Sequence, residues 1–190
     1  KTFIDATGDG DLAALCHVGF DKGRPSDGYT QPMSMIFKVG GIDFGKVISY
    51  MRQNPEQFIL HKDYKQLDRY LAVSGFFDIV RLAKACGDFN IPRDRILFFQ
   101  GLHPGEAFIN TSRIIKLSGL SSHDQTIAET EAARQVEELL TFFRKYLPGF
   151  ESSYLAAIAE VTGVRESRRI HGRYTLTVED VYEERTSSEG

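Results

Sequence analysis

The chain has 190 residues and a formal net charge of −3, with 42% hydrophobic and 26% charged residues. These values are ordinary for a globular chain of one domain or slightly more, and they provide no basic surface for nucleic acid. No apolar stretch approaches the length of a membrane span. The two cysteines, Cys16 and Cys86, are too far apart to suggest a disulfide framework. We expect both to be buried free thiols of a cytoplasmic protein.

The first candidate site is the segment TFIDATGDGDLAA at Thr2–Ala14. Phe3-Ile4 reads as a strand that enters a glycine-containing turn, and Asp11 begins a short helix. In α/β proteins this arrangement presents backbone N–H groups to a phosphate. The acidic side chains of Asp9 and Asp11 would repel a pyrophosphate, so two interpretations stay open. The turn either contacts a ligand or is an ordinary strand-to-helix turn capped by Asp9 or Asp11.

The middle of the chain predicts a small antiparallel sheet. After a loop at 18–28, alternating side chains at 31–39 predict a strand with Met33, Met35 and Phe37 on one face. The runs 95–99 and 107–117 read as a hairpin that this strand can join, with Phe108, Asn110, Ser112 and Ile114 sharing a face. The fold class expected from these elements is α+β.

Helices are expected at five further places. Asp43 caps the first, which ends at Asn54-Pro55, and Ser74 caps the second, which ends at Gly87. The longest, 126–146, begins with a capping box of Thr126 and Glu129. Its predicted apolar stripe is Ile127, Ala133, Val136, Leu140, Phe143 and Leu147. A shorter helix follows at 151–160, then strands at 161–170 and 173–176. Thr177 with Asp180 opens the last helix.

Three arginines in the predicted strand, Arg165, Arg168 and Arg169, form the second candidate site. On a regular strand Arg165 and Arg169 face one way and Arg168 the other. Arginines this close repel each other unless anions lie among them, and Glu166 can neutralise one. A pyrophosphate, a substrate carboxylate or remote acidic residues would serve the others. The alternative is a solvated or ion-paired strand between two domains.

The remaining polar residues give weaker signals. Asn110 and Arg113 could line a cleft, although a surface position is the simpler interpretation. His103, beside a proline in a turn, could act as a general acid or base but is more typical of a structural residue. The other histidines, His17, His61, His123 and His171, have no partners at metal-ligand spacing, so no metal site is expected.

The run FIDATGDGDLA resembles the "ATG" turn, the second flavin-contacting motif of the FAD-dependent oxidoreductase family, which is related to fumarate reductase and succinate dehydrogenase flavoproteins. Further pieces resemble the family in the same order, and together they span nearly the whole chain. These pieces are Gln31–Asp43, Ala107–Ile114, Leu147–Leu155 and Val161–Val181. The resemblance implies that the chain is the middle of a longer flavoprotein, whose first glycine-rich fingerprint and closing flavin-contacting segment lie outside it.

By this resemblance, residues 1–28 belong to a Rossmann-like FAD-binding domain, 29–163 form a substrate or cap domain, and 164–190 return to the first domain. FAD is the implied cofactor, and the implied reaction is hydride transfer to or from a small, anionic organic substrate. Backbone contacts to FAD would come from the turn Ala6, Thr7, Gly8, Asp9 and Gly10, and Arg165, Arg168 or Arg169 would hold an anionic group. The alternatives are a non-catalytic cap or docking module, or a self-standing nucleotide-binding domain of another class.

Overall fold

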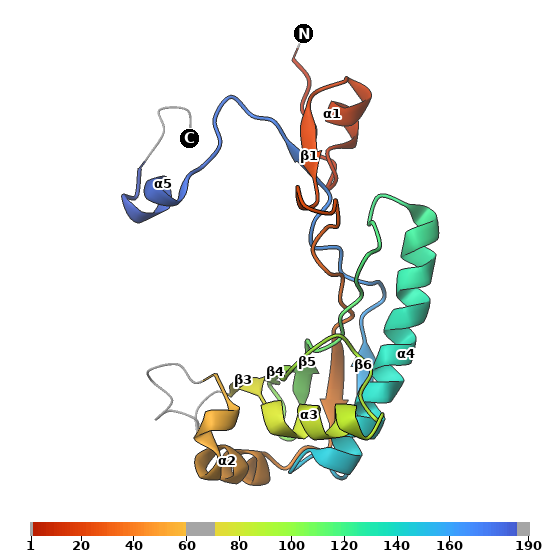
Figure 1. Ribbon diagram of the computed structural model, residues 1–190, viewed down its shortest axis with the longest axis vertical. Helices are drawn as coiled ribbons and strands as arrows, with labels where there is room; N and C mark the ends of the chain where they lie inside the picture. Colours follow the sequence, from red (N-terminus) through yellow and green to blue (C-terminus); the bar gives the residue numbers. More distant parts are fainter. Residues whose placement is uncertain (1, 60–70, 186–190) are drawn as a thin grey trace. The chain divides into compact units, whose positions relative to one another are not determined.

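The computed structural model describes residues 2–59 and 71–185, and the chain divides into two compact units (Figure 1). The larger unit is Gln31–Arg165, and the smaller unit joins Lys1–Thr30 to Glu166–Gly190. His61 and Lys62 lie outside the described residues. In the described ranges no helix is both long and apolar enough to cross a membrane.

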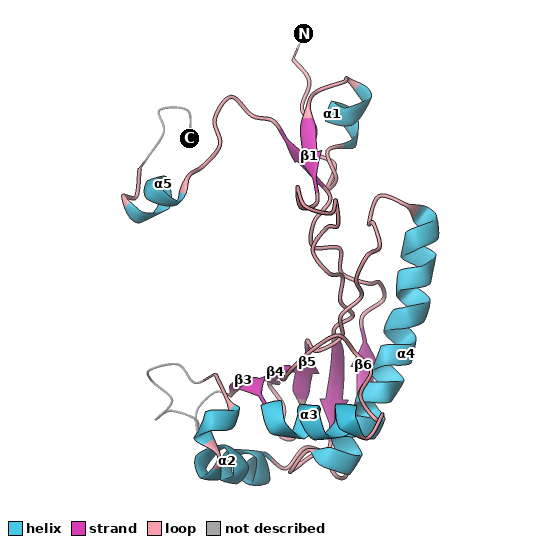
Figure 2. Ribbon diagram, viewed as in Figure 1, coloured by secondary structure: helices cyan, strands magenta, loops and turns pink. Residues whose placement is uncertain are grey.

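A five-stranded antiparallel sheet forms the centre of the larger unit, in the order β3-β4-β5-β2-β6. Its strands are β2 (Phe37–Gly40), β3 (Ala72–Gly75), β4 (Ile96–Gln100), β5 (Ala107–Ile109) and β6 (Tyr154–Ile158). The helices of this unit are α2 (Phe44–Gln53), the 3-10 helix η1 (Pro55–Gln57), α3 (Phe77–Ala85) and α4 (Ser122–Tyr146). Antiparallel strands with packed helices confirm the α+β fold (Figure 2). The predicted β4–β5 hairpin, joined by β2, is also confirmed.

One face of this sheet carries the core. Phe37, Phe98 and Ile109 are fully buried, whereas Phe99 and Phe108, paired across β4 and β5, are each more than two-fifths exposed. The alternation therefore distinguishes a covered face from an open face. The aromatic rings of Phe37 and Phe143 stack at 6.4 Å, which joins α4 to the covered face.

The predicted shared face of the strand 107–117 is wrong. Phe108 is exposed, Ser112 is fully buried, and the strand ends at Ile109. Beyond it, hydroxyl groups replace part of the sheet's hydrogen bonding: the Thr111 Oγ1 bonds to both the N–H and the carbonyl of Leu97. The Ser112 Oγ does the same to Met35. Because two consecutive side chains point into the protein here, regular alternation ends.

The residues at the two ends of α2 predicted the bounds of this helix correctly. Asp43 is the N-cap, its Oδ1 accepts a hydrogen bond from the N–H of Lys46 at 3.2 Å, and the helix ends at Asn54.

The predicted cap of α3 is wrong, because Ser74 lies in β3 and Phe76 takes the N-cap position. The side chain of Gln57, from η1, accepts the hydrogen bond of the first helical turn instead, from the N–H of Asp78 at 2.7 Å.

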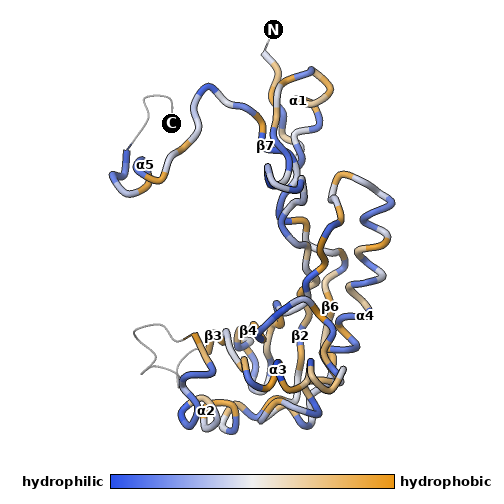
Figure 3. Tube along the Cα trace, in the orientation of Figure 1, coloured by the Kyte–Doolittle hydropathy of each residue, from blue (hydrophilic) through white to orange (hydrophobic). Residues whose placement is uncertain are grey.

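The start of α4 and part of its apolar stripe also differ from the prediction, although Val136, Phe143 and Leu147 are buried as predicted. Ser121 caps the helix by accepting a hydrogen bond from the N–H of Asp124, so a capping box at Thr126 does not form. Ile127 is 42% exposed and Ala133 is exposed, whereas Ala128 and Ala132 are fully buried. Hydrophobic and hydrophilic residues alternate along the helix (Figure 3). Near the N-terminal end of α4, the buried residues are small alanines rather than the larger side chains.

Residues 151–160 do not form the predicted helix, because β6 occupies Tyr154–Ile158 and pairs with β2. The pairing shifts register between Lys38 and Val39, as in a β-bulge. This pairing satisfies backbone hydrogen bonds along an edge of β2 that would otherwise be open.

The smaller unit contains α1 (Asp11–Leu15), β1 (Phe20–Lys22), β7 (Arg168–Ile170) and α5 (Val178–Tyr182). Strands β1 and β7 pair antiparallel, so the predicted loop 18–28 contains a strand. The predicted strands at Phe3-Ile4 and 173–176 are absent from the described residues, since neither segment pairs with another strand there. The capping box of α5, formed by Thr177 and Asp180, is confirmed.

Candidate functional site

The turn before α1 is held by hydrogen bonds to Asp5. Its Oδ1 accepts from the N–H and the hydroxyl of Thr7, at 2.9 and 2.6 Å, and its Oδ2 accepts from the N–H of Ala13 at 2.8 Å. The Thr7 hydroxyl accepts in turn from the N–H of Asp11 at 2.7 Å. These bonds favour the charged carboxylate, so the pKa of Asp5 lies below its ordinary value of 3.8, chiefly because of the Thr7 hydroxyl. The turn is therefore fixed at neutral pH.

The predicted helix cap at Asp9 or Asp11 is wrong, because Asp5 and Thr7 bond to the first turn of α1 from outside it. Gly10 takes the N-cap position with a left-handed φ of 66°, which favours glycine. A Cβ atom at this position would lie 2.8 Å from the Cδ1 of Ile170 in β7. Gly10 thus allows both the turn and the close approach of β7.

The backbone at Gly8 is open. A Cβ atom built on Gly8 would meet no atom of the described residues within 4 Å, and the φ of Gly8 is not left-handed. Within the described ranges, the N–H groups of Gly8 and Asp9 have no hydrogen-bond acceptor. A ligand can therefore approach the backbone here and accept hydrogen bonds from it.

Strand β7 lies beside this turn. The Nη1 of Arg168 donates to the carbonyl oxygen of Asp9 at 2.8 Å and to the Oδ1 of Asp11 at 2.7 Å. The guanidinium also lies over the ring of Phe20, 5.5 Å from its centroid. The structure thus brings the candidate turn together with part of the arginine-bearing segment. Arg168 neutralises one of the two acidic side chains that would repel a phosphate.

The other two arginines of that segment have different surroundings. Arg169 donates to the carbonyl oxygen of Gly23 at 2.8 Å and forms an ion pair with Glu166. Arg165 belongs to the larger unit. The expectation that Arg165 and Arg169 share a strand face is wrong, because β7 covers only Arg168–Ile170.

A family model described as FAD dependent oxidoreductase matches residues 1–190. The chain belongs to the FAD dependent oxidoreductase family. Its cofactor is therefore FAD, and its chemistry is oxidation and reduction. No curated protein and no solved structure matches the chain.

The open turn fits the cofactor of this family. The backbone of Gly8 has space beside it, the N–H groups of Gly8 and Asp9 have no acceptor within the described ranges, and the acidic neighbour Asp11 is already neutralised. A group with oxygen acceptors can lie against such a backbone without displacing any side chain.

The other candidates from the sequence are scattered. Within the described residues no group of three His, Cys, Asp or Glu side chains is placed to hold a metal ion. His171 lies 3.3 Å from the carboxylate of Asp21, and His103 is exposed in its turn. The prediction of buried thiols is wrong, because Cys16 and Cys86 are both exposed.

Asn110 and Arg113 are both half-buried, and they lie near a residue that the sequence did not single out, Arg93. The Nε and Nη2 of Arg93 donate to the carbonyl oxygens of Thr111 and Asn110, at 3.1 and 3.4 Å. No spacing or motif marks Arg93, which follows a proline before β4, so only the tertiary structure reveals it.

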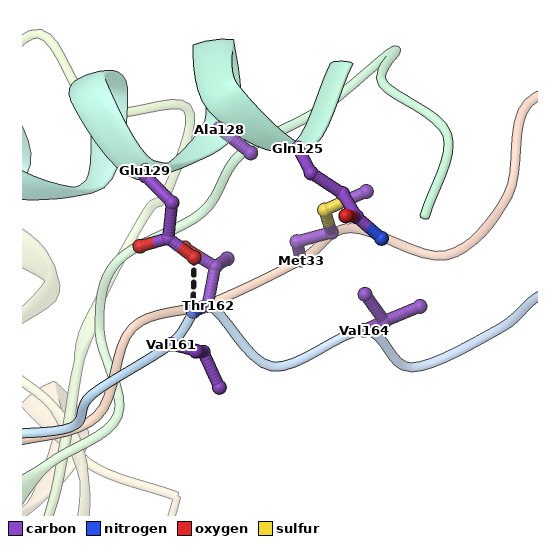
Figure 4. A pocket seen from close by; sticks show the side chains of 7 residues that line it. All are labelled: Met33, Gln125, Ala128, Glu129, Val161, Thr162 and Val164. Carbon is purple, nitrogen blue, oxygen red and sulfur yellow. Dashed lines mark hydrogen bonds between the residues drawn. The ribbon is translucent and has the colours of Figure 1, made fainter. Parts of the chain in front are cut away.

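A pocket of about 280 Å³ lies in the larger unit between the N-terminal part of α4 and the segment 161–164 (Figure 4). Its walls are mainly apolar and include Met33, Ala128 and Val164. The N–H of Thr162 donates to the Oε1 of Glu129 at 2.6 Å, while the buried Oγ1 of Thr162 has no partner among the described residues. The surface that the pocket offers is therefore mainly apolar.

Proposed function

We propose that this chain is part of a flavoprotein in which hydride passes between FAD and a small, anionic organic substrate. In this proposal residues 1–28 and 164–190 belong to a Rossmann-like FAD-binding domain, and residues 29–163 form the substrate or cap domain. The order of the family-like motifs supports a place in the middle of a longer protein related to fumarate reductase flavoproteins. The exposed free thiols suit a reducing compartment such as the cytoplasm.

The observation that carries the proposal is the open backbone of Gly8 within a turn that Asp5 and Thr7 hold rigid. A turn fixed before the ligand arrives loses little conformational entropy on binding. The backbone from Ala6 to Gly10 would hold an oxygen-rich part of FAD, with the N–H groups of Gly8 and Asp9 as donors.

FAD supplies the two-electron chemistry when it is bound. The residues of this chain position it and balance its charge. Arg168 would offset the charge of Asp11 beside the cofactor, and Arg169 would fix the loop that carries Gly23. Because Arg165 makes no ion pair within the described ranges, it is better placed than these two to hold an anionic substrate.

The test is spectroscopic. The complete protein that contains this chain should purify with flavin absorbance, and the absorbance should bleach anaerobically when a small organic acid acts as reductant. The 190-residue chain alone should bind FAD weakly or not at all. Saturable binding of NAD or S-adenosylmethionine by the chain alone, with no affinity of the complete protein for flavin, would contradict the proposal.

A further inference from the structure

Three arginines of the larger unit, Arg93, Arg113 and Arg165, form an arginine cluster. The Arg93 guanidinium bonds to the carbonyl oxygens of Asn110 and Thr111, just before Arg113 in the chain. Met33 pairs with Ile114 and Ser34 pairs with Gly163, so the segments that carry Arg113 and Arg165 lie on either side of one segment. The three arginines come from separate segments, which precede β4, follow β5 and follow β6. Burial lowers the pKa of Arg93, and the positive charges of Arg113, Arg165 and Arg95 lower it further. Arg93 nevertheless carries its charge at physiological pH, because a guanidinium group is not deprotonated in proteins.

Within the described ranges, no carboxylate pairs with the arginine cluster. Across residues 2–59 and 71–185, none of its three guanidinium groups forms an ion pair, and the nearby carboxylate of Asp94 pairs with Arg95 at 2.8 Å. Arg168 differs from these three arginines, because its guanidinium group pairs with the carboxylate of Asp11. Like charges gathered in this way repel each other, so an added anion would be attracted to all three.

The arginine cluster is also positioned in advance. The Arg93 guanidinium is held by the carbonyl oxygens of Thr111 and Asn110. The backbone of Arg113 is held by the buried side chain of Gln135, whose Oε1 accepts from the N–H at 2.7 Å and whose Nε2 donates to the carbonyl oxygen at 3.0 Å. Within the described ranges the guanidinium groups of Arg113 and Arg165 make no hydrogen bond, so their donors are available.

We propose that the arginine cluster binds the carboxylate or phosphate group of a small molecule. The planar fork of arginine pairs bidentately with either group. Arg165 is exposed and Arg113 is half-buried, so a solute can reach both. That the bound group belongs to the substrate of the redox reaction rests on the proposed function, whereas anion binding itself does not.

The test is isothermal titration of the full chain with malonate and, separately, with inorganic phosphate, at constant ionic strength. We expect saturable binding of at least one anion. Arg113→Gln and Arg165→Gln should each weaken it by about tenfold or more, because each removes one charged pair. Arg81→Gln is the matched control, since Arg81 is an exposed arginine of the same unit that pairs with Asp78. The control should bind within twofold of the unchanged chain.

The outcomes are distinct. Tighter binding of malonate assigns a carboxylate to the site, and tighter binding of phosphate assigns a phosphate group; either supports the proposal. Absence of saturable binding to both, or equal weakening in the Arg81→Gln control, overturns it. Unchanged thermal unfolding of each variant shows that affinity, rather than folding, has changed. A complete protein without flavin would refute the redox function while leaving this anion site intact.

Discussion

Replacing Gln135 by methionine tests how the buried amide supports the arginine cluster. The side chain of Gln135 is 1% exposed and bonds to both backbone groups of Arg113. Methionine keeps the length and the helix propensity but bonds to neither group. An unsatisfied buried group costs about 1–3 kcal/mol. Because Arg113 is half-buried, water can reach part of it, and we expect a total loss of about 2 kcal/mol.

Urea denaturation of the full chain measures this loss as a lower midpoint at unchanged slope. A loss of about 2 kcal/mol should also lower Tm by about 4–8 °C. Glu137→Met, on the exposed face of the same helix, is the control and should change stability by less than about 0.5 kcal/mol. If Gln135→Met costs no more than the control, the amide does not hold Arg113 as the structure indicates.

Three further predictions concern the turn and the core. Gly10→Ala should destabilise the smaller unit by about 1–2 kcal/mol, because residue 10 is left-handed; thermal unfolding with no change would contradict this. Phe143→Ala should cost about 3–5 kcal/mol in urea denaturation, because the ring is fully buried between Phe37 and Phe150; a loss below about 1 kcal/mol would refute the packing. Asp5 has a lowered pKa when folded, so its contribution is complete above pH 3.8 and is lost as the pH falls through the folded-state pKa. Amide NMR shifts of Thr7 and Ala13 should follow that titration, and shifts that stay constant below pH 3.8 would exclude the network.

Features coded within a few residues could be predicted from the sequence. The cap of α2 by Asp43 and the capping box of α5 each depend on side chains within one turn of the helix start. The β4–β5 hairpin was likewise recognisable, because its two strands are close in the chain.

Features that depend on a distant partner could not be predicted. Strand β6 takes its conformation from pairing with β2, although its own residues also suit a helix. Strand β1 similarly requires β7, far along the chain. The α3 cap comes from Gln57, outside the helix, so the local Ser74 was a misleading signal.

The candidate site likewise combines features that the local sequence predicts with features that depend on distant residues. The turn at Gly8 was recognisable from its glycines, but its support by Asp5 was not. The arginines close in sequence, Arg168 and Arg169, bond to neighbours within the smaller unit. Arg165 instead adds positive charge near Arg93, which is distant in the chain and carries no motif. Tertiary contacts, rather than sequence spacing, decide which charges remain unpaired.

The most direct test of the central claim is the flavin affinity of a Gly8→Ala variant of the complete protein, measured by titrating the apoprotein with FAD. The added methyl group meets no atom of the described residues within 4 Å, so the fold should be unaffected. It would project from the backbone that we propose contacts the cofactor, and affinity should fall by about tenfold or more. Gly45→Ala, in α2, should leave the affinity unchanged. Equal FAD affinities of the Gly8→Ala variant and the unchanged protein would contradict the account.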